Sequence, residues 1–140
     1  MNLSFMESVE KIRKAYQMYS YDIINEFNLS QIDFDIIMFL NNHKDQCTAK
    51  EFSKHKNIKP NVVSFHVDKL VSNGYLEREI LSGDRRKIKL IVTSKCKDII
   101  HKGKIMQEIF YQELTKGLDK KDIEEFRKTL NIILNNAKNL

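Results

Sequence analysis

The sequence predicts a mainly α-helical protein with one small antiparallel β-hairpin. Two short helical patterns follow one another in residues 49–72, and a period-two pattern around a basic loop follows them in residues 76–93. On either side, residues 1–28 and 95–140 carry apolar side chains at helical spacing. Two tandem helices followed by a hairpin have the element order of a winged helix-turn-helix lobe, which we place at about residues 31–93 of a single domain covering residues 1–140.

The second tandem helix is expected from Pro60 to Ser72. Proline suits the first helical position, where its missing N–H would have had no helical partner, and Asn73-Gly74 provide an exit that tolerates left-handed geometry. At about 100° per residue, three apolar residues fall on one narrow stripe that we expect to be core: Val63, Val67 and Leu70.

The opposite face of this helix is polar apart from one aromatic residue. It carries Asn61, Phe65, Asp68 and Ser72, with Ser64 and Lys69 on its flanks. A phenylalanine on a polar face leaves a large apolar area in water unless a partner covers it. We therefore interpret Phe65 as a contact residue.

The first tandem helix is expected from Ala49 to His55. Thr48 and Glu51 have the spacing of a capping box, in which each side chain binds a backbone N–H of the first turn. Asn57 is expected in the left-handed conformation within the turn between the two helices.

The hairpin is expected to consist of the strands Leu76–Leu81 and Lys87–Thr93. On the second strand, Ile88, Leu90 and Val92 share one face, and Lys87 and Lys89 lie on the other. The connecting loop, Ser82-Gly83-Asp84-Arg85-Arg86, places two guanidinium groups at the tip.

Basic charge is concentrated in this lobe. Between Lys50 and Leu90, ten Lys and Arg stand against five Asp and Glu, an excess equal to the formal net charge of +5 of the whole chain. Such an excess suits a surface that displaces counterions from nucleic-acid phosphates. A merely solvated basic face would explain the charge alone, but the pattern of helices and hairpin around it favours nucleic acid.

The flanking segments predict long amphipathic helices. Residues 3–27 carry apolar and aromatic residues at steps of three and four: Phe5, Val9, Ile12, Tyr16, Tyr19 and Ile23. Ser30, with Asp33 at the capping-box position, begins a helix over Gln31–Leu40 whose apolar body is expected to be central core.

The C-terminal segment predicts two further helices. Ser94–Thr115 is helical by period, with Gly103 as a weak point and an inward side made of Ile99, Met106, Ile109, Phe110 and Leu114. Gly117 ends it, and a last amphipathic helix begins near Asp119. A terminal helix of this kind needs a surface to cover, which argues for a homodimer with twofold symmetry formed through the chain ends.

The residues after the second tandem helix carry a specific resemblance. Asn73-Gly74-Tyr75-Leu76-Glu77-Arg78, followed by Asp84-Arg85-Arg86, Leu90 and Thr93, resembles the wing signature of the MarR family of bacterial transcriptional regulators. The similarity covers nearly the whole chain in length and element order. Phe65 stands where Arg is common in that family, and Cys96 and Asn57 stand where Gly is frequent.

The resemblance implies a homodimer that binds double-stranded DNA, with the second tandem helix in the major groove and Arg86 of the wing in the minor groove. The implied DNA-binding residues are Lys59, Asn61, Ser64, Phe65, His66, Lys69, Arg85, Arg86 and Lys87, and Asp84 would orient the wing. The resemblance also places a small-molecule effector between the dimer helices and the winged lobe. The candidate lining residues are Tyr16, Tyr19, Met38 and Phe39, although a helical aromatic stripe is more often plain core.

The sequence carries no enzyme motif, since it has no Gly-rich phosphate loop, nucleophile elbow or His-x-x-x-His pair. We expect no catalysis, no cofactor and no bound metal. Cys47 and Cys96 have neither metal-ligand nor disulfide-framework spacing, so inert thiols are expected. The sequence has no apolar run of membrane length and no signal-peptide pattern, which predicts a cytoplasmic protein.

The resemblance therefore implies a ligand-responsive repressor that binds a pseudo-palindromic operator, because most members of that family are repressors. The alternative is a winged-helix module that binds another protein through Phe65 and its neighbours. The two differ in salt dependence, because only the release of counterions from DNA predicts a steep one.

Overall fold

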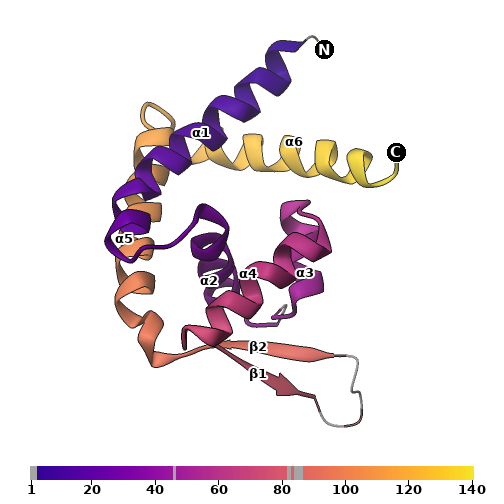
Figure 1. The fold of residues 1–140 in the computed structure, drawn as a ribbon. Coiled ribbons are helices and arrows are strands. Elements are labelled where there is room, and N and C mark those ends of the chain that lie inside the picture. Colours follow the sequence, from indigo (N-terminus) through magenta and orange to yellow (C-terminus); the bar gives the residue numbers. More distant parts are fainter. Residues whose placement is uncertain (1–2, 46, 82, 84–86) are drawn as a thin grey trace. The chain divides into compact units, whose positions relative to one another are not determined.

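The computed structural model describes residues 3–45, 47–81, 83 and 87–140 (Figure 1). Its elements in chain order are α1 (Leu3–Glu26), α2 (Gln31–Asn42), α3 (Ala49–Lys56), α4 (Pro60–Ser72), β1 (Leu76–Ile80), β2 (Ile88–Val92), the 3-10 helix η1 (Ser94–Cys96), α5 (Lys97–Leu114) and α6 (Lys120–Lys138). The predicted fold class, mainly α with a small antiparallel hairpin between long terminal helices, is confirmed. The chain forms two compact units, one ending at Met106 and the other covering Gln107–Leu140.

Helix α2 is the core of the first unit, as its apolar body predicted. It contacts α1, α4 and β2, and its buried residues are Asp33, Phe34, Ile36, Ile37, Met38, Phe39 and Leu40. The predicted capping box is present, because the Asp33 backbone N–H donates to Ser30 Oγ at 3.1 Å and the Ser30 N–H donates to Asp33 Oδ2 at 2.9 Å. These two reciprocal bonds fix the residue at which α2 begins.

Helices α3 and α4 pack on each other and, with α2, form the body from which the hairpin extends (Figure 1). Asn57 has the predicted left-handed conformation, with φ of 52°. The predicted capping box of α3 is only half present among the described bonds: Thr48 Oγ1 accepts from the Glu51 N–H at 3.1 Å, but the structure gives no return bond from the Glu51 carboxylate. That carboxylate instead lines a groove beside the hairpin, where water can solvate it.

The exit of α4 fixes where the hairpin begins. The N–H of Tyr75 donates to the Leu70 carbonyl at 2.9 Å and the N–H of Gly74 donates to the Val71 carbonyl at 3.0 Å, the two bonds of a Schellman motif. Gly74 has φ of 82°, which a residue with a Cβ rarely adopts. The Thr93 hydroxyl, at the end of β2, donates to the Gly74 carbonyl at 2.6 Å and so fastens both ends of the hairpin to this turn.

Strands β1 and β2 pair antiparallel from Leu76 opposite Val92 to Ile80 opposite Ile88. They are shorter than predicted, since Leu81, Lys87 and Thr93 lie outside the strands. Leu76 and Leu90 are buried, but Ile88 is exposed rather than sharing the buried face. The pair of Ile80 and Ile88 closes the outer end of the ladder, which extends away from the helices (Figure 1).

The second unit contains the end of α5 and all of α6. Asp119 caps α6 through a capping box with Asp122, and Gly117, with φ of 87°, lies in the turn before it. Ile99 and Met106 of α5 are buried as predicted, whereas Ile109 and Leu114 are exposed, contrary to the prediction. A unit of two helices has too little surface to enclose a core, and no residue of α6 is buried.

Candidate nucleic-acid interface

Helix α4 presents a polar face away from the core, as its period predicts. Val63, Val67 and Leu70 are buried against the rest of the lobe. Asn61 and Ser64 are exposed, and the Phe65 side chain is 65% exposed, so this face carries an uncovered aromatic ring as well as two hydrogen-bonding side chains. This combination can contact both the polar and the methyl groups of base edges.

The start of α4 adds positive character to this face. Lys59 is exposed at the N-cap, Pro60 occupies the first turn, and that turn contains no acidic residue. The N-terminus of a helix carries partial positive charge and backbone N–H groups without helical partners. An anion such as a phosphate is therefore favoured there.

His66 and Lys69 turn towards the protein interior, although the sequence analysis placed them among the DNA contacts. His66 Nδ1 lies 2.8 Å from Asp33 Oδ1, and Lys69 Nζ donates to Asp33 Oδ2 at 2.7 Å. The Lys69 side chain remains 38% exposed, but that of His66 is only 14% exposed. The structure thus gives both side chains a partner on α2, which the sequence analysis missed.

The Asp33 carboxylate is fully buried and still ionised. Burial by itself raises the pKa of this group, but the hydrogen bonds from Lys69, the Ser30 backbone and His66 outweigh burial and hold the pKa below its ordinary value. The sequence assigned Asp33 only to the capping box. A capping box uses one carboxylate oxygen, and no signal in the sequence identified the basic residues of α4 as partners for the other.

The hairpin is tied to α4 by an ion pair. The Arg78 guanidinium on β1 donates to the Asp68 carboxylate on α4, and both side chains are partly exposed. Lys87, just before β2, is exposed, as predicted for a DNA contact. Asp84, Arg85 and Arg86, which the sequence analysis placed at the tip, lie outside the described residues.

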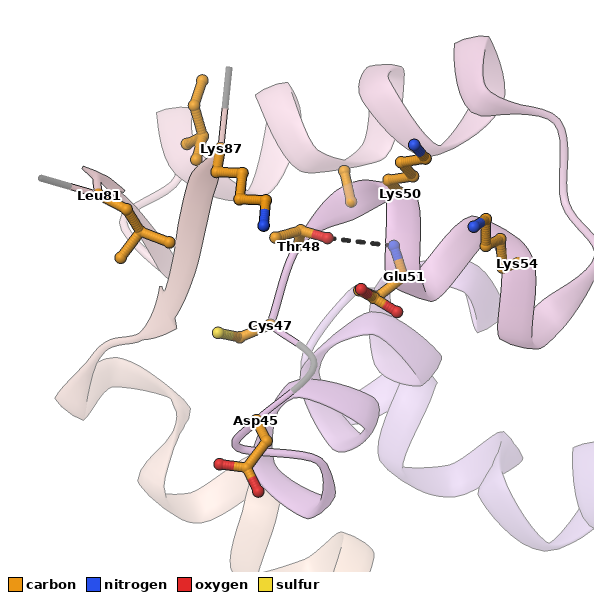
Figure 2. Close-up of a pocket in the computed structure, with 10 residues that line it drawn as sticks. Asp45, Cys47, Thr48, Lys50, Glu51, Lys54, Leu81 and Lys87 are labelled. Atoms are coloured by element: carbon orange, nitrogen blue, oxygen red, sulfur yellow. Dashed lines mark hydrogen bonds between the residues drawn. The ribbon is translucent and has the colours of Figure 1, made fainter. Parts of the chain in front are cut away.

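An open groove of about 770 Å³ separates the start of α3 from the hairpin. Figure 2 shows Lys50 and Lys54 projecting from α3 and Lys87 extending from the hairpin side towards Thr48. Leu81 and Ile88 contribute an apolar wall. The sequence analysis did not single out Lys50 and Lys54, although their spacing of four on one short helix predicts that they share a face.

None of the four candidate pocket residues lines either of the two grooves beside the hairpin. Met38 and Phe39 are adjacent in sequence, so their side chains leave α2 in different directions. Met38 lies against Gly103 of α5, whereas the Phe39 ring packs on Phe52 of α3 with ring centroids 5.4 Å apart.

The Cys96 thiol is buried, and burial raises its pKa to about 11, which fits an inert thiol. Cys47 is partly buried, and its carbonyl accepts from the Leu90 N–H of β2 at 2.7 Å. Within the described part of the chain, the structure has no group of three or more His, Cys, Asp or Glu residues that could hold a metal ion. Over the same residues, no helix combines the length and apolar character needed to cross a membrane.

Residues 27–87, which contain α2 to α4 and β1 but not β2, match the sequence model of the MarR family. This part of the chain is therefore similar to the MarR family. A comparison with curated proteins finds no significant match.

Solved structures share the fold over almost the whole chain. A MarR transcriptional regulator from Methanosarcina mazei Go1 is 20% identical, with a TM-score of 0.79 and 99% of each chain covered. MepR from S. aureus, in a complex with DNA, is 14% identical, with a TM-score of 0.78 over 97% of this chain and 96% of that one. A mutant MarR from E. coli complexed with operator DNA is 18% identical, with a TM-score of 0.71 over 94% of each chain. At these identities, the similarity establishes the fold.

Proposed function

We propose that the protein is a homodimeric repressor that binds a pseudo-palindromic operator in double-stranded DNA. One α4 helix enters the major groove in each half-site, and each hairpin reaches the adjacent minor groove. The observation that carries this proposal is the outward face of α4, where Asn61, Ser64 and Phe65 are exposed and available to base edges.

Basic side chains on both sides of this face support phosphate contacts. Lys59 lies at the start of α4, while Lys50, Lys54 and Lys87 surround the groove between α3 and the hairpin. These groups can neutralise backbone phosphates and so fix the register of α4 on the duplex. Arg85 and Arg86 extend the same role to the tip, where Asp84 orients the wing.

Exposed apolar side chains at both ends of the chain support the homodimer. Val9 and Ile12 on α1 and Phe126 and Leu134 on α6 are all exposed in the single chain. Apolar residues at helical spacing that a monomer leaves in water are the usual material of a subunit interface. Two copies of the chain also supply the two reading helices that a palindrome requires.

Linkage would explain how a ligand relieves repression by this protein. A small molecule that binds better to an arrangement of the two lobes incompatible with the operator lowers DNA affinity by the difference in its binding free energies. Tyr16, Tyr19, Met38 and Phe39 remain the candidate lining residues, but in a conformation or dimer that opens a cavity beside α2. A regulator of chromosomal DNA would act in the cytoplasm, and we include that location in the proposal.

Selection of duplex fragments by the full-length protein, followed by binding assays at several salt concentrations, tests this function. We expect one enriched pseudo-palindrome, bound with an affinity that falls steeply as salt rises. Binding that neither selects a sequence nor depends on salt would contradict the proposal and would favour a protein-binding module.

A further inference from the structure

The contacts of His66 point to a role other than direct DNA contact. Its ring lies between a buried carboxylate on α2 and the exposed ring of Phe65 on its own helix. His66 Nδ1 lies 2.8 Å from Asp33 Oδ1, and the centroids of the His66 and Phe65 rings lie 5.3 Å apart with an interplanar angle of 90°. That angle corresponds to an edge-to-face ring pair.

The bond to Asp33 fixes the plane of the imidazole. Because an ionised carboxylate can only accept hydrogen bonds, Nδ1 of His66 carries the proton and donates it to Oδ1. The carboxylate cannot turn freely, since Oδ2 accepts from the Ser30 N–H at 2.9 Å and from Lys69 Nζ at 2.7 Å. Asp33 therefore holds His66 through one oxygen while its other oxygen is anchored to two separate elements.

Phe65 needs such support because of where it lies. Its side chain is 65% exposed, so little packing restricts the ring, and an exposed ring that must be ordered on binding loses conformational entropy at that moment. A fixed imidazole beside it favours one orientation of the ring before DNA arrives.

We propose that Asp33 and His66 are positioning residues that orient Phe65 on α4 and thereby set the sequence discrimination of the protein. This inference rests on the proposed function, in which Phe65 reads bases. His66 acts through Phe65, Asp33 acts through His66, and neither touches the duplex. A direct contact between His66 and DNA is the competing assignment, and the variants below separate the two.

Two substitutions of His66 each remove one of its two contacts and keep the other. In His66→Asn the amide can still donate to Asp33, but the ring that faces Phe65 is lost. In His66→Phe the ring remains, but its donor to Asp33 is lost. We expect the ratio of operator affinity to non-specific affinity to fall in both variants, roughly two- to tenfold in His66→Asn, which is the range that one aromatic pair supplies. The slope of log affinity against log salt should stay unchanged, because no phosphate contact is removed.

The same substitutions in a Phe65→Ala background provide the decisive comparison. There we expect no further loss of discrimination, because the residue being positioned is absent. An undiminished effect in that background, or a salt slope lowered by about one, would overturn the proposal and assign His66 to the DNA contact itself. Failure of the wild-type protein to prefer any duplex would instead contradict the proposed function.

A measurement without DNA keeps the inference testable on its own. In the NMR spectrum of the full-length protein, we expect the Phe65 ring protons to lose the shift caused by the neighbouring imidazole in His66→Asn and to move in Asp33→Asn. Far-UV circular dichroism should show that both variants remain folded, and if Asp33→Asn does not fold, His66→Phe replaces it as the variant that lacks the Asp33 bond. The proposal would be overturned if the Phe65 ring shifts stayed identical to those of the wild type both in a folded variant without the His66 ring and in a folded variant without the Asp33 bond.

Discussion

Gly103 of α5 lies directly against Met38 of α2. A Cβ added to Gly103 would lie 2.6 Å from Met38 Sδ and 3.2 Å from Phe34 Cε1, distances that force a neighbour to move. All three residues belong to the first unit, and both α2 side chains are buried. The glycine that the sequence presents as a weak point of a helix is therefore a position of close approach between α5 and α2.

The first prediction is that Gly103→Ala destabilises the protein by about 1–3 kcal/mol, because overpacking outweighs the gain in helix propensity. The measurement is the free energy of unfolding in urea. Met38→Ala should be costly by itself, since it leaves a cavity, but the double variant should cost less than the sum of the two single changes. Strictly additive losses of unfolding free energy would show that Gly103 and Met38 are not energetically coupled.

The second prediction concerns Phe65 as a base contact. Phe65→Ala should weaken binding to the preferred operator by about 1–3 kcal/mol and binding to a non-specific duplex by less. Phe65→Leu, which keeps an apolar group, should retain part of the difference. Stability should hardly change, because the side chain is 65% exposed. Equal losses of affinity on both duplexes would argue against a base contact.

The third prediction tests the wing. Arg86→Ala should weaken operator binding by about 1–3 kcal/mol and lower the slope of log affinity against log salt by about one. Asp84→Ala should also weaken binding, although it removes a negative charge, because the loop loses its orientation. Lys116→Ala, an exposed site in the second unit, serves as the control for charge alone. Tighter binding by Asp84→Ala, with an unchanged slope in Arg86→Ala, would reduce the wing to a solvated basic loop.

The fourth prediction is a pH dependence carried by Asp33. Its pKa is lower in the folded protein than in the unfolded chain, so its contribution to stability is present above about pH 4 and is lost as the pH falls through the folded value. Asp33→Asn should therefore be less stable than the wild type at neutral pH, and the difference should shrink in acid. Urea unfolding at a series of pH values measures this difference.

Asp35, on the same helix, provides a control of opposite sign. Burial raises the pKa of its carboxyl despite the bond from Gln31 Nε2 at 3.0 Å, so ionising it costs stability as the pH rises through the folded pKa. Asp35→Asn removes that cost, so the stability of this variant relative to the wild type should increase as the pH rises. Stability curves of Asp33→Asn and the wild type that stay parallel down to acid pH would contradict the role given to Asp33.

Local signals in the sequence predicted the elements that carry the interface. The bounds Pro60–Ser72, the Ser30 capping box and the left-handed Asn57 all depend on residues within one or two turns of each other, and the structure has all three. The buried stripe of α4 was predictable for the same reason, because helical period determines which residues share a face.

Partners across the fold could not be predicted in this way. Period places His66 and Lys69 on a flank of α4 but does not say that Asp33, more than thirty positions earlier, lies opposite them. For the same reason, the sequence could not show that Met38 and Phe39 contact different helices. Nor could it show that the apolar side chain of Ile109 is exposed in the single chain. Periodicity predicts that a face is apolar, whereas tertiary or quaternary packing determines what covers it.

The most direct test of the central claim is the stoichiometry and footprint of the protein on its selected operator. Sedimentation of the complex, combined with hydroxyl-radical footprinting, should show two protomers on one duplex that protect two symmetric half-sites centred about one helical turn, roughly 10 bp, apart. A single protomer that protects one half-site, with the free protein monomeric at micromolar concentration, would contradict the account.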